Sequence, residues 1–509
     1  MNMKKISLSI FALGLLVFLA SPNFVKAQSG TDTLAPQVST LRDKISGVED
    51  RLATAEASLD KLTKIKISGY VQAQWQHWEA ANVFPSNYLT IRRARFKLQY
   101  EPAQGVVFVL QPDFQPSNFV VKEAYTRINE PWLKTFSLWV GKFNRPNYEV
   151  EYSSSDLEAL ERSRVITTLY PGEYAIGAKL EVAPPSIPLK FQLAIFNGND
   201  GQVIPDATGA NQNAADNKDF DNYKDLMARL TYAFRLGRWG GLTIGAHGYY
   251  GAVRATTDTL LKSDYTKNKA VAVGSALNRN WVGVEAQFFV DVLGGLVLKG
   301  EYITGINAFP GFNSTTSSTS FSSSVNATKD TVTQTYTTLK TTSIAPNIQR
   351  NFSGFYVYLV KNIGKRNQFT IRYDKFDPNT KLAGGDLGVK AYKASSTKTT
   401  TTTNTFGSAG NVLVNKEVNT AAVNNSLNSG TADLAYRQIT LAWSYYFDDN
   451  IKISLAYDIP LNEKVGVNKG GVGNVLSGSY AAPGGISSKL DYSNLIKQNV
   501  LTLRFQAKF

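Results

Sequence analysis

Several segments of this chain alternate between apolar and polar residues, and this pattern constrains the fold more than any other feature. In residues 66–78 the odd positions are mostly apolar and the even positions mostly polar, and residues 93–100 and 501–509 repeat the alternation. Strands of about ten such residues are typical of transmembrane β-barrels, where one face meets lipid and the other meets water. Lipid offers no hydrogen bonds, so only helices and closed barrels cross it. The apolar run at residues 6–20 is shorter than the roughly 20 residues that a spanning helix needs, and no later run reaches that length.

The alternation predicts sixteen antiparallel strands. They begin near residues 66, 88, 104, 119, 134, 173, 188, 223, 240, 278, 294, 351, 366, 434, 450 and 498. Short and long connections alternate along the chain, except that the first two outward loops, near 79–87 and 115–118, are short. The long connections span residues 144–172, 199–222, 252–277, 306–349, 378–432 and 460–495. Outer-membrane barrels have short turns on one side and long loops on the other. We therefore predict an all-β fold, a sixteen-stranded antiparallel transmembrane β-barrel over residues 66–509.

Two of the long connections are low in complexity. Residues 313–345 and 394–430 consist mainly of Ser, Thr and Asn. This composition predicts mobile, solvated surface segments without a function of their own. Phe509 ends the last alternating strand, as is typical of barrels that are inserted into the outer membrane.

The N-terminal residues have the features of a secretory signal peptide. Lys4 and Lys5 precede the apolar run, and residues 25–27 offer small side chains for cleavage before Gln28. A positive start, a short apolar stretch and small residues are what export machinery recognises. We expect residues 1–27 to be removed and the protein to reach the outer membrane of a Gram-negative cell.

A short α-helical coiled coil is predicted between the signal peptide and the barrel, in residues 28–65. Its apolar residues recur at alternating spacings of four and three: Leu34, Val38, Leu41, Ile45, Val48, Leu52, Ala55, Leu59 and Leu62. Lys44 with Glu49 and Arg51 with Glu56 have the spacing that attracts parallel helices to one another. The heptads do not choose between dimer and trimer, and a single amphipathic helix on the barrel mouth is the alternative.

Composition excludes several kinds of chemistry. None of the 509 residues is Cys, which removes disulfides, thiolate metal sites and cysteine nucleophiles. The net charge of +14 suits nucleic acid, an anionic membrane or anionic solutes, and export makes nucleic acid the least suitable partner. We expect no cofactor, because the glycines at 470–473 lie in a loop. No group of Asp, Glu and His has the spacing of a metal site.

Nine motifs resemble the phosphate-selective porin O and P family. They are GYVQAQ at 69–74, RRARFKL at 92–98, KEAYTRI at 122–128, VGKFNRPNYEVE at 140–151, ERS at 161–163, YAIGAKL at 174–180, KGEYITG at 299–305, RYDKFDPN at 372–379 and SYYFDDNIKISLAYD at 444–458. The resemblance implies a homotrimeric outer-membrane channel whose third outward loop folds into the pore. The third outward connection here is residues 144–172, between the fifth and sixth predicted strands.

Basic residues fall on the polar faces of the predicted strands. Arg93, Arg95 and Lys97 would form a ladder on one strand, and further predicted pore-lining or anion-binding residues are Arg127, Arg229, Arg372 and Arg504. Such a field concentrates anions, and guanidinium forks suit phosphate oxygens. The alternative is that wall carboxylates, such as Glu123 for Arg127 and Asp374 for Arg372, neutralise these cations. Arg92 breaks the alternation, and it either extends to the membrane interface or marks a bulge.

The predicted constriction loop carries opposing charges. Its candidate residues are Glu149, Asp156, Glu158, Glu161 and Arg162. Acid on the loop facing base on the wall predicts a transverse field. The spacing of Ser155 and Glu158 fits a capping box, which predicts a short helix over residues 153–161.

The predicted function is passive diffusion of small hydrophilic solutes, with a preference for anions such as phosphate. One alternative is a structural anchor held through the coiled coil. A less favoured alternative is an outer-membrane hydrolase, which would need a histidine with a hydroxyl or carboxylate partner. The only histidines are His77 and His247, and we expect no catalytic site. The sequence leaves open the solute, the conductance and any modification of the Ser/Thr-rich loops.

Overall fold

The computed structural model describes most of the chain from residue 44 onward. The described residues are 44–52, 54, 56, 63–79, 85–115, 118–146, 150–171, 173–198, 203–205, 211–213, 221–291, 295–326, 331–386, 390–393, 400–406, 413–461, 463, 479–482, 486–489 and 499–509. The predicted signal peptide and most of the heptads lie outside these residues, as does Glu149.

The chain divides into two units, residues 1–64 and residues 65–509. In the first unit, residues 44–52 are helical. Ile45, Val48 and Leu52, three of the predicted seam residues, are 56%, 61% and 58% exposed in the single chain. Among the described residues, no helix is long and apolar enough to span a membrane.

The second unit contains the predicted barrel, and its closure is confirmed. Each of sixteen strands pairs antiparallel with the next, and the last strand pairs with the first. The strands are β1 (Ile65–Trp78), β2 (Asn87–Ala103), β3 (Val106–Gln115), β4 (Asn118–Asn129), β5 (Phe136–Asn144), β6 (Tyr174–Val182), β7 (Leu189–Asn197), β10 (Lys224–Arg235), β11 (Gly240–Arg254), β14 (Ala276–Val290), β15 (Leu296–Phe309), β18 (Asn347–Ile363), β19 (Asn367–Asp377), β23 (Tyr436–Tyr446), β24 (Ile451–Pro460) and β27 (Val500–Lys508). Every strand begins within four residues of its predicted start.

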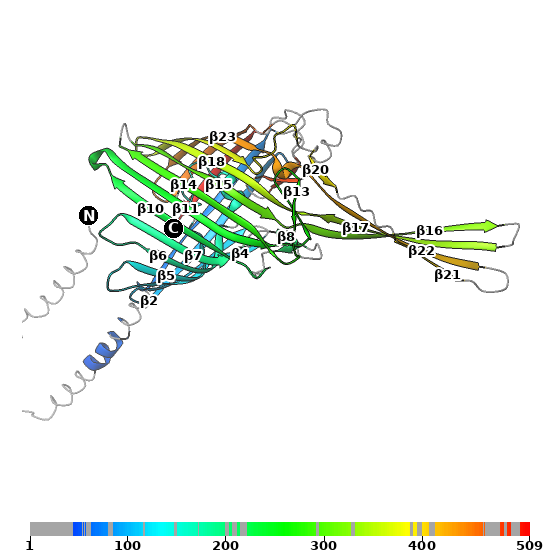
Figure 1. The fold of residues 1–509 in the computed structure, drawn as a ribbon. Coiled ribbons are helices and arrows are strands. Elements are labelled where there is room, and N and C mark those ends of the chain that lie inside the picture. Colours follow the sequence, from blue (N-terminus) through cyan, green and yellow to red (C-terminus); the bar gives the residue numbers. More distant parts are fainter. Residues whose placement is uncertain are drawn as a thin grey trace, which may run out of the picture. The chain divides into compact units, whose positions relative to one another are not determined.

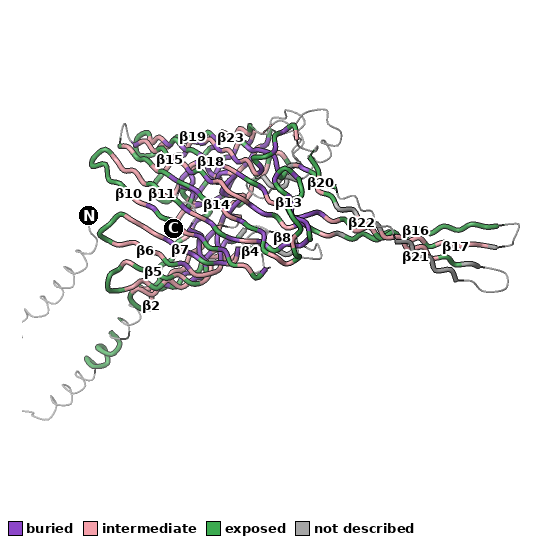
Figure 2. The backbone as a smooth tube through the Cα atoms, in the orientation of Figure 1, coloured by how far each residue is buried: buried purple, intermediate pink, exposed green. Residues whose placement is uncertain are grey.

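Inward and outward positions differ in exposure as the alternation predicts. On β19, the outward Ile371 is 50% exposed, whereas the inward Arg372 is only 2% exposed. The outer face therefore presents apolar side chains, and the lumen holds polar and charged ones. Figure 2 shows buried residues concentrated along the barrel strands.

The seam between the chain ends depends on a glycine. Gly69 and Phe509 exchange two backbone hydrogen bonds of 3.0 Å. A Cβ atom on residue 69 would lie 2.5 Å from the Phe509 ring and 2.4 Å from the carbonyl oxygen of Arg95. The terminal aromatic ring therefore packs over β1 only because position 69 has no side chain.

The prediction of mobile Ser/Thr-rich loops is wrong for the described residues of 313–345 and 394–430. They form a second sheet, here called the blade (Figure 1), which contains β16 (Phe312–Asn326), β17 (Thr331–Ala345), β20 (Ala391–Lys393), β21 (Thr400–Phe406) and β22 (Leu413–Asn428). Low complexity suggested disorder, but threonine is β-branched and favours extended strands. Threonines also pair across the strands, as Thr315 does with Thr342 at 3.1 Å.

The remaining described elements are short. The strands are β8 (Val203–Pro205), β9 (Asn211–Asn213), β12 (Thr259–Leu261), β13 (Lys267–Ala270), β25 (Ser479–Ala482) and β26 (Ile486–Lys489), and the helical turns are η2 (Gly237–Trp239), η3 (Thr431–Asp433) and α3 (Arg164–Leu169). β12 pairs with the start of β18, which places this connection against the wall.

Candidate constriction site

The described residues of the connection between β5 and β6, which are 145–146, 150–171 and 173, lie inside the barrel. The hydroxyl groups of Ser154 and Tyr70 on β1 are 2.7 Å apart. Lys299 on β15 donates from Nζ to the backbone oxygen of Val150 at 3.3 Å. β1 and β15 are far from each other around the closed wall, so one loop reaches both only by crossing the lumen.

The helix in this loop is not where the capping box predicts it. Residues 153–161 form turns, and the helix is α3 (Arg164–Leu169). The carboxylate of Glu158 bonds to Lys299 Nζ at 2.7 Å instead of capping a helix. Leu160 has a φ of 64°, which is incompatible with a right-handed helix. Three apolar residues of α3 are buried: Val165, Ile166 and Leu169.

A bulge explains why Arg92 breaks the alternation. In the β1–β2 pairing, Gln72 lies opposite Arg93 and Ala73 lies opposite Ile91, so Arg92 has no partner in the register. An extra residue in one strand reverses the in–out pattern on one side of it. As a result two successive arginines point into the lumen.

A second bulge does the same for a lysine that the alternation missed. In the β3–β4 pairing, Gln111 lies opposite Glu123 and Pro112 opposite Val121, which leaves Lys122 unmatched. The Lys122 ammonium lies 5.9 Å from the centre of the Tyr174 ring, inside the barrel. The sequence did carry a signal for both bulges, because two charged residues are adjacent in each strand: Arg92 with Arg93, and Lys122 with Glu123.

Glu161 gathers three arginines at the loop. Arg92 donates from Nε and Nη2 to the two carboxylate oxygens of Glu161, both at 2.9 Å. Arg93 Nη2 lies 3.3 Å and Arg504 Nη2 lies 2.5 Å from the same carboxylate. Burial alone would raise the pKa of Glu161, but the attraction of these arginines outweighs it and holds the pKa well below its usual range.

A second cluster surrounds Glu173. Arg95 bonds to Asp113 at 3.0 Å and lies 3.8 Å from Glu173, which also pairs with Arg162. Burial would raise the pKa of Glu173, but the attraction of Arg162, Arg95 and Lys122 lowers it to about 2. These ion pairs, whose side chains are largely shielded from solvent, hold the loop to β2 and β3.

The two clusters leave positive charge in excess. Around the carboxylates of Glu161, Glu173 and Asp113 stand six cations, namely Arg92, Arg93, Arg95, Lys122, Arg162 and Arg504. Three negative groups cannot neutralise six positive ones, so the wall-bracing alternative accounts for only part of the cluster. Glu161 and Glu173 of the loop face arginines of the wall, which is the arrangement that a transverse field requires, and cations are in excess.

Three further predicted wall residues, which lie outside these two clusters, are paired with carboxylates. Lys97 Nζ lies 2.6 Å from Glu123, and Arg229 Nε donates to Glu285 at 3.0 Å. Arg372 lies 3.5 Å from Glu151 and donates to the backbone oxygen of Glu161 at 2.5 Å. These cations brace the wall and the loop.

The carboxylates named as alternative partners make their closest contacts elsewhere, although Asp374 still attracts Arg372 electrostatically. Glu123 pairs with Lys97, while Arg127 lies 5.2 Å from the centre of the Trp139 ring. Asp374 accepts a hydrogen bond from the backbone nitrogen of Arg164 at 2.6 Å and so holds the start of α3.

The remaining loop residues differ in their surroundings. Asp156 is 59% exposed and pairs with Lys508 near the end of the chain. Arg162 is buried and donates to the backbone oxygens of Glu151 and Tyr152, both at 2.8 Å, so it shapes the loop from within.

Of the two histidines, His247 has both a carboxylate and a hydroxyl beside it, from Glu301 and from Tyr170 at 3.4 Å from Nε2, but all three side chains are buried. His77 stacks on Trp75, and Glu79 accepts hydrogen bonds from Tyr457 at 2.7 Å and Asn499 at 3.0 Å. His247 is buried, with Nδ1 3.5 Å from a carboxylate oxygen of Glu301. In the described part of the chain, no three potential metal ligands gather in one place.

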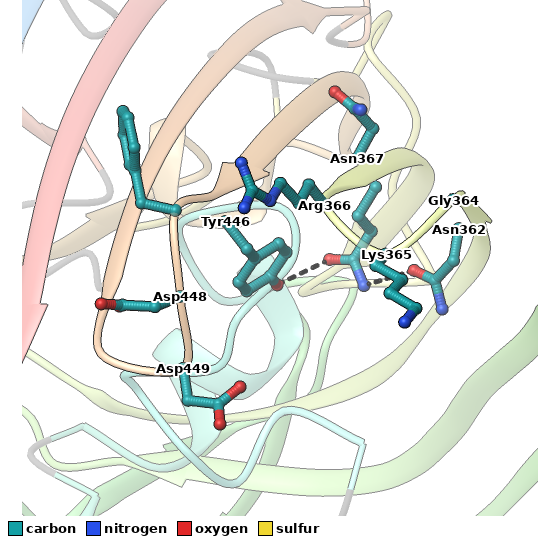
Figure 3. A pocket seen from close by; sticks show the side chains of 10 residues that line it. Asn362, Gly364, Lys365, Arg366, Asn367, Tyr446, Asp448 and Asp449 are labelled. Carbon is teal, nitrogen blue, oxygen red and sulfur yellow. Dashed lines mark hydrogen bonds between the residues drawn. The ribbon is translucent and has the colours of Figure 1, made fainter.

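A pocket of about 430 Å³ lies at the short-turn end, between the β18–β19 and β23–β24 turns (Figure 3). Tyr446 donates to Gln368 at 3.2 Å, and Gln368 donates to Asn362 at 3.0 Å. Its charged residues are of both signs, Lys365, Arg366, Asp448 and Asp449. The pocket therefore has no cationic surplus comparable with that around the loop.

Comparisons with known proteins give one family. Residues 65–280 match the family model described as phosphate-selective porin O and P. No curated protein matches the sequence significantly. The motifs at 299–305, 372–379 and 444–458 lie outside the match, and their resemblance stays a prediction.

Solved structures of similar shape are porins and other outer-membrane proteins at low identity. An anion-selective porin from Comamonas acidovorans is 11% identical with a TM-score of 0.47, and the alignment covers 87% of this chain and 99% of that one. A Salmonella typhi OmpF complex with daunomycin is 12% identical with a TM-score of 0.42, covering 87% and 97%. Over residues 65–280, the resemblance predicted from the motifs is confirmed, and this part of the barrel matches the phosphate-selective porin O and P family.

Proposed function

We propose that this protein is an outer-membrane porin, a passive channel for small hydrophilic solutes that prefers anions such as phosphate. The observation that carries the proposal is the surplus of six cations over three carboxylates where residues 145–173 cross the lumen. A narrow aqueous path with low-dielectric walls focuses such a field. An anion then enters more readily than a cation of the same size.

Most of these six cations are arginines rather than lysines, which favours the binding of oxyanions. Five of the six cations are arginines on β2 and β27 or in the loop beside them, and four of these, Arg92, Arg93, Arg95 and Arg504, lie 2.5–3.3 Å from carboxylate oxygens. A phosphate offers the same oxygen geometry with more charge. A phosphate can exchange such contacts with one arginine after another, so it binds and leaves the channel without a chemical reaction.

The test is the zero-current potential of the purified protein in a salt gradient. We expect Arg93→Ala/Arg95→Ala to shift this potential toward cations, because both side chains lie in the cluster. The matched control is Lys365→Ala/Arg366→Ala, which removes the same charge from the exposed short-turn end. An unchanged potential in the first variant, or equal shifts in both, refutes the assignment.

The cellular arrangement is part of the proposal. Residues 1–27 would direct export and be removed, and residues 28–65 would form a periplasmic coiled coil of a homotrimer embedded among outer-membrane lipids. Support comes from Ile45, Val48 and Leu52, whose exposure in the single chain leaves a helical stripe for neighbouring copies. Deleting residues 30–62 should weaken the trimer in semi-native electrophoresis, and an unchanged trimer would contradict this role.

The structural anchor is the second candidate, favoured only by that same helical stripe. It differs from the channel in one measurable way. An anchor with a sealed lumen passes no current in a planar bilayer, whereas a channel opens in steps of constant conductance.

A further inference from the structure

The outer edge of the blade has no partner among the described residues. The sheet runs β16-β17-β22-β20 with β21 beside β22, so β16 stands at one end of the order. β16 pairs with β17 over fifteen consecutive positions without a bulge, from Phe312 opposite Ala345 to Asn326 opposite Thr331. Among the described residues no strand pairs with its other side, along an edge about 50 Å long.

β16 also lacks the features that normally protect such an edge. Its sequence, FNSTTSSTSFSSSVN, contains no charged residue, no proline and no glycine. Natural edge strands are usually blocked by lysines, prolines or bulges, because an open edge is a template for another strand. Residues 315–326 are all exposed, so side chains do not cover the edge either.

The uncharged sequence favours a second copy of this chain as the partner. A charged edge would repel its own copy, whereas a Ser/Thr edge does not. Two identical edges related by a twofold axis form an isologous interface, and their strands then run in opposite directions. The full overlap of two fifteen-residue strands places Thr319, the central residue, opposite Thr319 of the second copy.

The direction of β16 decides where the second copy lies. β16 begins three residues after the end of β15, and β18 begins two residues after the end of β17. The blade therefore continues a membrane-spanning hairpin at its long-loop end (Figure 1). Copies in one membrane point their β16 strands the same way, so antiparallel pairing joins copies in two facing membranes.

We infer that β16 pairs antiparallel with β16 of a second copy in a facing membrane, which makes the blade a homophilic contact between surfaces. The inference does not depend on the lumen.

The first experiment uses vesicles that contain the full-length protein and carry either a red or a green lipid. Wild-type protein should bring red and green vesicles together. Thr316→Lys/Ser320→Lys should abolish this, because it places charges on the edge. The control is Thr337→Lys/Thr341→Lys, which adds the same charges to the residues opposite, one strand inward, and should cluster normally. No clustering of wild type, or equal behaviour of the two variants, overturns the inference.

The second experiment uses the absence of cysteine from the chain. Single variants Ser317→Cys, Thr319→Cys and Ser323→Cys are oxidised after vesicles are mixed. We expect intermolecular disulfides mainly at 319, since only the central position faces itself. No dimer, or a flat profile across the three positions, would overturn the inference. Conductance recorded on the same samples separates this result from a failure of the channel proposal.

Discussion

Replacing Glu161 by Gln tests how the loop sets selectivity. The carboxylate contacts Arg92 at 2.9 Å, Arg93 at 3.3 Å and Arg504 at 2.5 Å. Gln keeps the shape of Glu but removes the only negative charge in contact with all three. The variant therefore raises the net charge by one where the loop crosses the lumen, and we expect stronger anion preference.

The size of the effect follows from Coulomb's law. An ion roughly 8 Å from the added charge gains about 0.5 kcal/mol in water. Screening over a Debye length of about 8 Å reduces this to about 0.2 kcal/mol. Anion entry rises and cation entry falls by that amount, so the anion-to-cation permeability ratio should increase about twofold, and about fivefold at low salt.

The assay is the zero-current potential in a potassium chloride gradient, at high and low salt. Asp156→Asn is the matched control, because Asp156 is 59% exposed and solvent screens its charge. Glu161→Gln should also destabilise the loop by about 3–5 kcal/mol, the usual cost of removing one partner from a buried ion pair. A shift toward cations, or no shift at low salt, would refute the reasoning; a large conductance increase would indicate that the loop has left the lumen.

Three further predictions concern the loop, the bulge and the seam. The pKa of Glu173 falls from 4.5 to about 2 in the folded loop, so its stabilisation is complete above pH ~4.5 and is lost as the pH falls toward 2. Conductance should be steady from neutral pH to about 5 and change below it, and a transition near pH 7 would contradict this. Deleting Arg92 should leave a folded barrel, because the deletion removes the bulge and preserves the alternation. Deleting Phe96 should prevent folding, because it turns half of β2 inside out. Heat-modifiable electrophoretic mobility distinguishes the two results. Gly69→Val should destabilise the barrel by about 1–3 kcal/mol, because its side chain would collide with the terminal ring, and an unchanged midpoint in guanidinium unfolding would exclude this role of the glycine.

The barrel could be predicted from the sequence because its physics is local. Each strand must satisfy lipid on one side and water on the other, so the period of two appears in every segment. Strand starts therefore agree to within four residues. The blade could not be predicted in the same way, because its strands are polar on both faces and carry no alternation. Only the β-branched side chain of threonine favoured strands there.

The candidate site was predictable in its residue types but not in its pairing. Alternation placed Arg93 and Arg95 in the lumen, and the structure places both beside the loop. It did not place Arg92 or Lys122, because each is the extra residue of a bulge, and alternation alone does not say on which face such a residue lies. Which carboxylate meets which arginine depends on the path of residues 145–173 across the lumen, and that path is set by tertiary contacts.

A planar-bilayer recording of the purified wild-type protein tests the central claim most directly. A water-filled lumen with a cationic surplus predicts ohmic steps, grouped in threes for a trimer, and a zero-current potential that follows chloride across a salt gradient. A membrane that stays silent after insertion, or a potential that follows potassium, would contradict the account.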